Sequence, residues 1–171
     1  MNTQYLIFRE LIKENTEEFC KKVVEISNWL GVNPNHLMFL MWFETGHTLD
    51  HRTKNKIGAV GLIQFIQSTA KYLGTTTDKL VAMSNVEQLD YVKKHLAPYR
   101  GKYKDYVDLY CAIFWPKAVG QPDTFRITSD IVAVQNPLFD INKDKDIEKA
   151  EIRTALERQI PKQYKSFFYT K

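Results

Sequence analysis

The sequence has few of the residues that disulfide-rich, zinc-binding or membrane-spanning proteins require. It contains two cysteines, Cys20 and Cys111, each among apolar residues of an expected helix. Two buried, reduced thiols are therefore expected in preference to a disulfide or a nucleophile. The four histidines are dispersed and no His–Cys spacing indicates a zinc site. No apolar run approaches the roughly 20 residues that a membrane span needs.

The excess of positive over negative charge is also modest. Lys and Arg number 24, Asp and Glu number 20, and the net charge is +4 with the basic residues scattered. This pattern does not specifically indicate nucleic acid as a partner. The first 15 residues lack the basic start and the long apolar run of a signal peptide. The length of 171 residues, 44% of them hydrophobic, predicts a single domain, 1–171, with a sizeable core.

What the sequence does contain is helical periodicity, and it predicts a mainly α fold with at most a small β-hairpin. Caps and breakers such as Ser84, Gly31 and Pro98 mark several of the helix ends. The expected helices span residues 3–14, 16–30, 34–45, 68–73, 78–83, 85–96, 105–117 and 149–158.

The segment 33–64 is the most informative part of the chain. Asn33 is a good N-cap, Pro34 suits the first turn, and Gly46 is a typical residue after a helix end. The helix between them should run to about Thr45 and is apolar nearly all round, as buried helices are, and Glu44 ends its apolar stripe near the C-terminus. Burial and the negative end of the helix dipole both raise a carboxyl pKa, which suits a general acid. The alternative is that Glu44 is merely the first solvated residue at the helix end.

A polar loop follows this helix, and the chain then returns through Gly58-Ala-Val-Gly61-Leu-Ile-Gln64. The two glycines permit unusual backbone angles or a close approach of neighbouring chain. A carboxylate, a polar loop and a glycine-flanked segment carrying Gln64 together predict one side of a cleft.

The pattern Glu44-Thr45-Gly46, a polar loop, then Gly58 to Gln64 resembles the soluble lytic transglycosylase family, relatives of goose-type lysozyme. The match covers roughly residues 30–73 well and 105–120 loosely. The resemblance implies a lysozyme-like α+β domain with a buried central helix. It also implies that Glu44 is the catalytic acid/base, with Thr45 and Gln64 binding substrate.

The family's third motif, Ala-Tyr-Asn-Ala-Gly, is altered in this chain. Aligning its end places Ala112 at the tyrosine position, and Tyr110 lies two residues earlier. A phage-associated branch of the family has a sequence closer to the one found here. We expect the helix 105–117 to pack against the Glu44 helix and to present Tyr110 or Trp115 to the cleft.

The function implied by the resemblance is cleavage of the β-1,4 bond between N-acetylmuramic acid and N-acetylglucosamine, giving 1,6-anhydro products without a catalytic cofactor. The expected partner of a monomeric protein is the peptidoglycan glycan strand, in the periplasm, outside the cell or on a virion. One alternative is a hydrolysing lysozyme or endolysin with a second carboxylate, for which Asp50 is nearest in sequence. The other is a non-catalytic glycan-binding or virion structural module.

Residues 140–151 match the 12-residue calcium-loop template of EF-hands. The predicted ligands of a structural calcium ion are Asp140, Asn142, Asp144, Asp146 and Glu151. Lys145 replaces the usual glycine at the sixth position, and no clear helix precedes the loop. The alternative is a relic loop that caps the following helix. We expect the loop to belong to a C-terminal appendage, 136–171, without a catalytic role.

Overall fold

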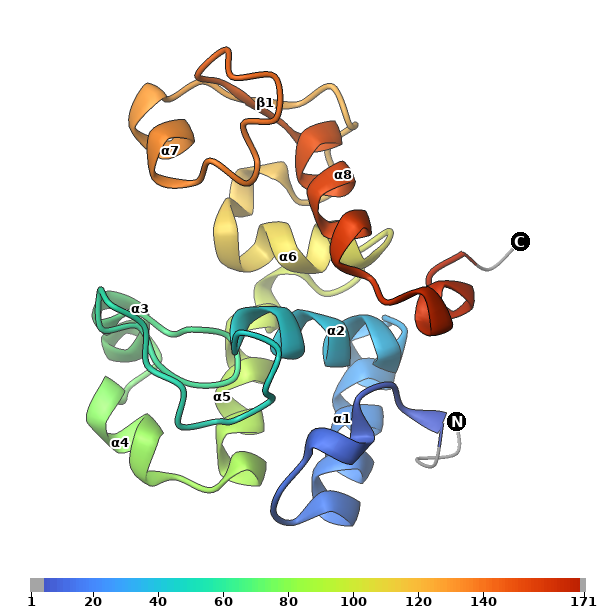
Figure 1. Cartoon of the computed structure of the whole chain (residues 1–171). Coiled ribbons are helices and arrows are strands. Elements are labelled where there is room, and N and C mark those ends of the chain that lie inside the picture. The colour runs from blue at the N-terminus through green and yellow to red at the C-terminus, as the bar shows by residue number, and fades with distance from the viewer. Residues whose placement is uncertain (1–4, 170–171) are drawn as a thin grey trace.

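The computed structural model describes residues 5–169 and shows a mainly helical protein, as predicted (Figure 1). Short 3-10 turns at Arg9–Leu11, Ala97–Tyr99, Pro116–Ala118 and Lys162–Phe167 connect or follow the longer helices. Within the described residues, no helix is both long and apolar enough to cross a membrane. The α-helices are α1 (Thr16–Leu30), α2 (Pro34–Glu44), α3 (Gln67–Tyr72), α4 (Thr77–Ala82), α5 (Asn85–Leu96), α6 (Tyr106–Phe114), α7 (Asp130–Gln135) and α8 (Lys149–Gln159).

Helix α2 lies at the centre and packs against α1 and α6 (Figure 1). The side chain of Asn33 caps it by accepting the N–H of Asn35, and Pro34 occupies the first turn. Residues Leu37 to Trp42 are all buried. The helix ends at Glu44, and Gly46 then adopts a left-handed φ of 61°. The predicted buried helix and both of its ends are therefore confirmed.

The prediction of a helix over 3–14 was wrong in the part that the structure describes. Residues 5–14 contain no α-helix; Arg9–Leu11 forms a short 3-10 turn, and Phe8 has a φ of 60°, which interrupts a right-handed helix. The Phe8 ring instead stacks on Trp42 with ring centres 4.3 Å apart. The N–H of Ile7 donates to the side chain of Asn35 over 3.0 Å. Packing on α2 has overridden the local helical period.

The β-structure is small, but it is not a hairpin. Strand β1 (Arg126–Ile127) pairs antiparallel with β2 (Ile147–Glu148), and α7 lies between them in sequence. Sequence reasoning assigned no element to α7. Isolated bridges also join Val60 to Lys54 and to Phe65, within the return segment.

The C-terminal segment shares the core of the rest of the chain. Helix α8 contacts α6, and Ile152 and Leu156 belong to the same hydrophobic cluster as the residues of α2. A buried ion pair joins the two helices, with Lys149 Nζ 2.6 Å from Asp108 Oδ1. Cys20 and Cys111 are both buried and free, as predicted.

Candidate functional site

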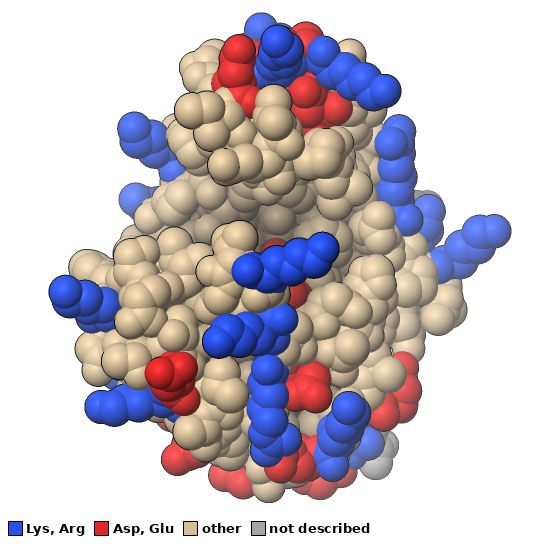
Figure 2. Space-filling view, turned by 60° about the vertical axis from the view of Figure 1, so that its left-hand side comes forward, with Lys and Arg blue, Asp and Glu red and all other residues tan. Residues whose placement is uncertain are grey.

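A pocket of about 240 Å³ lies where the end of α2, the return segment, α6 and the end of α7 meet. Figure 2 shows the face concerned, which is hollowed between the C-terminal part at the top and the body below, with mostly uncharged walls. The volume lies below the roughly 300–1,000 Å³ of sites that enclose a small ligand, as expected for one part of an open groove. The lining residues are Glu44, Asn55, Ile57, Ala59, Ile63, Gln64, Ile66, Tyr110, Ile113, Phe114 and Asn136.

Glu44 is the one acidic residue among those that line the pocket. Its carboxyl forms no ion pair or hydrogen bond with any other residue that the structure describes. Burial among apolar side chains raises its pKa from 4.5 to about 7. Its place at the C-terminus of α2 acts in the same direction, because the dipole there disfavours negative charge. The expected raised pKa therefore has a clear structural cause.

Tyr110 lines the pocket from α6 and is only 7% exposed. Its ring meets Phe43 edge-on at 5.6 Å and contacts Phe114 and Phe139. Burial, and then the charge of Glu44, raise the pKa of Tyr110 well above its usual value. Its hydroxyl therefore stays protonated at neutral pH as a hydrogen-bond donor near Glu44. Trp115 is not among the lining residues.

Gln64 also lines the pocket, and it shapes the return segment as well. It adopts a φ of 53°, and its Nε2 donates to the carbonyls of Thr53 (3.2 Å) and Gly61 (3.1 Å). Its amide nitrogen thus closes the loop, while its Oε1 has no hydrogen bond within residues 5–169.

Gln88, on α5, holds the return segment in place by hydrogen bonds, and it was not predicted from the sequence. Its Oε1 accepts the N–H of Leu62, and its Nε2 donates to the carbonyls of His51 and Leu80. Gly61 permits this approach, because an added Cβ would lie 2.5 Å from Gln88 Oε1. The one available signal was a glutamine on the apolar side of a predicted helix, beside Leu89.

Thr45 does not line the pocket, so its expected substrate contact is not supported by its position. It is 1% exposed. Its hydroxyl donates to the carbonyl of Met41 at 2.7 Å and accepts the N–H of Leu49 at 2.8 Å. Thr45 therefore supports the end of α2 and the start of the following loop, which fixes the backbone beside Glu44.

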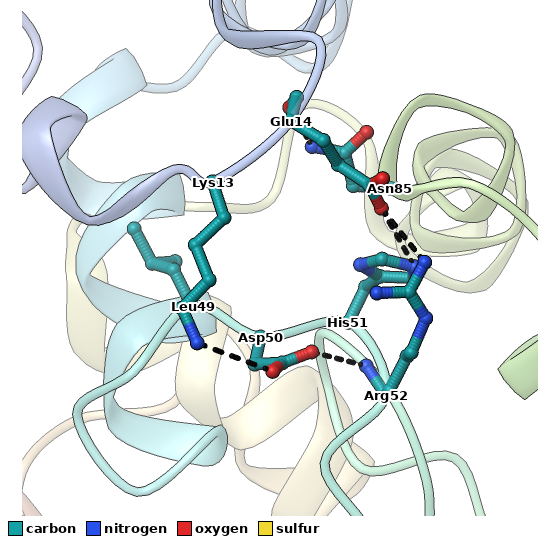
Figure 3. Close-up of a pocket in the computed structure, with 7 residues that line it drawn as sticks. All are labelled: Lys13, Glu14, Leu49, Asp50, His51, Arg52 and Asn85. Atoms are coloured by element: carbon teal, nitrogen blue, oxygen red, sulfur yellow. Dashed lines mark hydrogen bonds and ion pairs between the residues drawn. The ribbon is translucent and has the colours of Figure 1, made fainter.

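Asp50 faces a different pocket, of about 110 Å³, shown in Figure 3. Its carboxylate accepts the N–H of Arg52 at 2.9 Å and lies 3.6 Å from Lys13 Nζ. That backbone hydrogen bond, and then the charge of Lys13, lower the pKa of Asp50. Nearby, Glu14 pairs with Arg52 at 3.1 Å and lies 3.3 Å from His51. Asp50 is thus not placed as a second carboxylate beside Glu44.

In the loop 140–151, Lys143 and Lys145 adopt left-handed backbone angles, and the described residues show no converged set of ligands. Lys145, at the sixth position, adopts the left-handed φ of 66° that glycine usually supplies. Glu151 accepts the backbone N–H groups of Ile141, Asn142 and Glu148. No group of three or more His, Cys, Asp or Glu side chains within residues 5–169 is arranged to hold a metal ion. Calcium binding by Asp140, Asn142, Asp144, Asp146 and Glu151 stays a prediction.

Comparisons with protein-family models, curated proteins and solved structures gave no match. The chemistry of the pocket is then the basis for a function. It combines one carboxyl that titrates near neutral pH, one protonated phenol, three amide side chains and apolar walls. Such a set can exchange a proton with a neutral, hydrogen-bonding ligand.

Proposed function

We propose that the protein is a peptidoglycan-cleaving lytic transglycosylase with a lysozyme-like fold, in which Glu44 alone serves as general acid and base. The observation that carries the proposal is Glu44 itself, which has no ion-pair or hydrogen-bond partner within residues 5–169, lies in a pocket of apolar and uncharged polar side chains, and has a pKa of about 7. A carboxyl that holds its proton near neutral pH is what a glycosidic leaving group requires. The resemblance of residues 30–73 to the transglycosylase family supports the same reaction.

In this mechanism the protonated Glu44 gives its proton to the oxygen that links N-acetylmuramic acid to N-acetylglucosamine. The bond from that oxygen to C1 of the muramic acid breaks. The Glu44 carboxylate then takes the proton from the C6 hydroxyl of the same sugar, whose oxygen bonds to C1. The 1,6-anhydro ring forms without consuming water, and Glu44 regains its proton. Tyr110, in the pocket wall near Glu44, donates a hydrogen bond from its hydroxyl to the bound sugar.

Two features favour this reaction over the alternatives. A hydrolysing lysozyme usually has a second carboxylate that positions or replaces water, whereas Asp50 lies in another pocket with Lys13 and Arg52. A glycan-binding or virion structural module does not require a carboxyl that holds its proton near neutral pH, whereas a general acid does. An enzyme of this kind acts on the bacterial cell wall, in the periplasm, outside the cell or as part of a virion.

Mass spectrometry of fragments released from purified peptidoglycan tests the proposal, with the wild type and Glu44→Gln compared. Anhydro-muramyl fragments from the wild type alone are the expected result. Fragments heavier by one water would identify a lysozyme instead. No fragments from folded wild-type protein, on several wall types, would favour the binding module. Because the acid form of Glu44 starts the reaction, kcat/KM should fall as the pH rises through about 7.

A further inference from the structure

We infer that Asn55 and Asn136 recognise the acetamido group of the sugar that lies against Glu44. The inference rests on the proposed function and adds two specificity residues that the sequence motifs do not contain. Both side chains line the Glu44 pocket, Asn55 from the return segment and Asn136 from the end of α7. The hydrogen bonds that each amide already makes decide which of its atoms is left for a ligand.

The side chain of Asn55 has its N–H donor group available for a ligand. Its Oδ1 accepts the N–H groups of Ile57 and Ala59, each at 3.0 Å, which uses both acceptor positions of that oxygen. Its own backbone N–H donates to the carbonyl of Ala59 at 3.0 Å. The side chain is therefore held by the loop that it caps. Its Nδ2 makes no hydrogen bond within the described part of the chain and is free to donate.

The side chain of Asn136 has its acceptor oxygen available for a ligand. It ends α7, and its Nδ2 donates to the carbonyl of Val132 at 2.8 Å. Its backbone N–H is also used, on the carbonyls of Val132 and Ala133. Its Oδ1 accepts no hydrogen bond from residues 5–169. Gln64 presents a second such oxygen, since its nitrogen closes the return segment.

The pocket thus contains one hydrogen-bond donor and one acceptor, each fixed by the other hydrogen bonds of its side chain. Together they match the carbonyl and the N–H of an amide. The acetamido carbonyl accepts one hydrogen bond, its N–H donates one, and its methyl group is apolar. Asn55 Nδ2 pairs with the carbonyl, Asn136 Oδ1 pairs with the N–H, and Ala59 and Ile63 offer apolar surface to the methyl. A hydroxyl at this position has its donor and its acceptor on a single oxygen and carries no methyl group, so it cannot reproduce the separate carbonyl, N–H and methyl of an acetamido group.

The test uses the full chain carrying Glu44→Gln, so that binding is measured without cleavage. The probes are the pentamer of N-acetylglucosamine and cellopentaose, which has hydroxyls in place of acetamido groups, each titrated by NMR or calorimetry. Adding Asn55→Asp keeps the oxygen that accepts from Ile57 and Ala59 but removes the donor. The affinity for the acetylated pentamer should fall about tenfold or more, as expected for an unpaired polar group, with that for cellopentaose unchanged.

Asn28→Asp, on the exposed face of α1, adds the same charge away from the pocket and should alter neither affinity. Asn136→Ser keeps a hydroxyl that can bond to the carbonyl of Val132, but its oxygen lies on a shorter side chain and is drawn back from the pocket, so it should give a smaller loss of the same selectivity. Equal losses for both probes, or no loss, would overturn the inference while Glu44-dependent cleavage left the proposed function standing. Absence of both cleavage and pentamer binding would overturn both.

Discussion

Two pockets of this protein contain acidic groups in opposite surroundings. In the pocket of Figure 3, Asp50 and Glu14 lie among Lys13, His51 and Arg52, and the pKa of Asp50 is lowered. In the other pocket, Glu44 has amide, phenol and apolar neighbours, and its pKa is raised to about 7. A carboxylate with charged and N–H partners is stabilised as the anion, while one without them keeps its proton.

Of the acidic groups in these two pockets, Glu44 is the one without an ion-pair or hydrogen-bond partner among the described residues. The protein can satisfy a buried charge, as it does where Asp108 accepts Lys149 Nζ and the N–H groups of Lys104 and Gly120. Glu44 has no such partner within residues 5–169, and its carboxyl therefore holds its proton to a higher pH. Groups perturbed by desolvation within a cleft are candidates for function on this ground.

The largest expected effect concerns activity and separates the two pockets directly. Glu44→Gln should reduce the rate of peptidoglycan cleavage by at least about 100-fold, because it removes the general acid and base. Asp50→Asn should leave the rate unchanged, since Asp50 serves the charged pocket. Release of soluble fragments from labelled wall measures both. A comparable loss in the two variants would show that Asp50 takes part, as a lysozyme mechanism requires.

The next effect concerns a buried charge that does have a partner. Lys149→Met should destabilise the fold by about 3–5 kcal/mol, because it leaves the carboxylate of Asp108 buried without its cation. Urea unfolding monitored by circular dichroism measures the change. Lys143→Met, on an exposed lysine of the loop 140–151, serves as the control. Equal stability of both variants would mean that the pair contributes nothing to the packing of α8 on α6.

Stability against pH should differ in sign between the two pockets. The pKa of Glu44 is raised in the folded protein from 4.5 to about 7. The folded state therefore holds a proton that the unfolded chain has lost, and stability falls as the pH rises between these values. Glu44→Gln removes this penalty and should stabilise the protein by up to about 3 kcal/mol at pH 8, with little effect at pH 4.

Asp50→Asn should change stability at pH 8 in the opposite direction to Glu44→Gln. The pKa of Asp50 is lowered by the N–H of Arg52 and by Lys13, so its contribution is present at pH 8 and lost as the pH falls through the folded pKa. The variant should therefore be less stable than the wild type at pH 8. Unfolding curves for both variants at pH 4 and pH 8, and for Asp50→Asn also at a pH below the ordinary aspartate pKa of 3.8, measure this. A stability gain at pH 8 from Asp50→Asn would contradict the assignment of the two environments.

The smallest expected effect concerns calcium binding by the loop 140–151, which is the third cluster of acidic side chains considered. If the loop 140–151 binds the ion, millimolar calcium should raise the melting temperature by about 2–4 °C, corresponding to about 1 kcal/mol, relative to a chelator. Asp140→Ala should remove the increase, whereas Asp78→Ala, on the exposed start of α4, should retain it. Equal melting temperatures with calcium and with chelator would identify the loop as a cap for α8 only.

Local features of the fold were predictable from the sequence. The capping of α5 by Ser84 with Glu87, and the packing of the apolar α6 on α2, follow from caps and helical periods. The segment from Phe8 to Ile12 was not predictable, because its apolar spacing fits a helix equally well until Phe8 meets the ring of Trp42. Periodicity identifies the buried face of a segment and not always its backbone.

Polar partners distant in the chain were beyond the sequence. Gln88 bonds to Leu62 across 26 residues, and Lys149 bonds to Asp108 across 41. Thr45 looked like a cleft residue, but its hydroxyl is used within the end of α2. Such pairings depend on which elements the core brings together, and no local pattern specifies that.

By itself, the sequence determined the buried helix 34–44, its caps and the position of Glu44 at its end, because capping and burial are encoded within a few neighbouring residues. Only the tertiary structure decided that Glu44 would lack a partner while Asp50 gained two, and that Asn55 and Asn136 would join it in one pocket. The pKa of a carboxyl depends on everything packed around it, and the pocket neighbours of Glu44 come from the return segment, α6 and the end of α7.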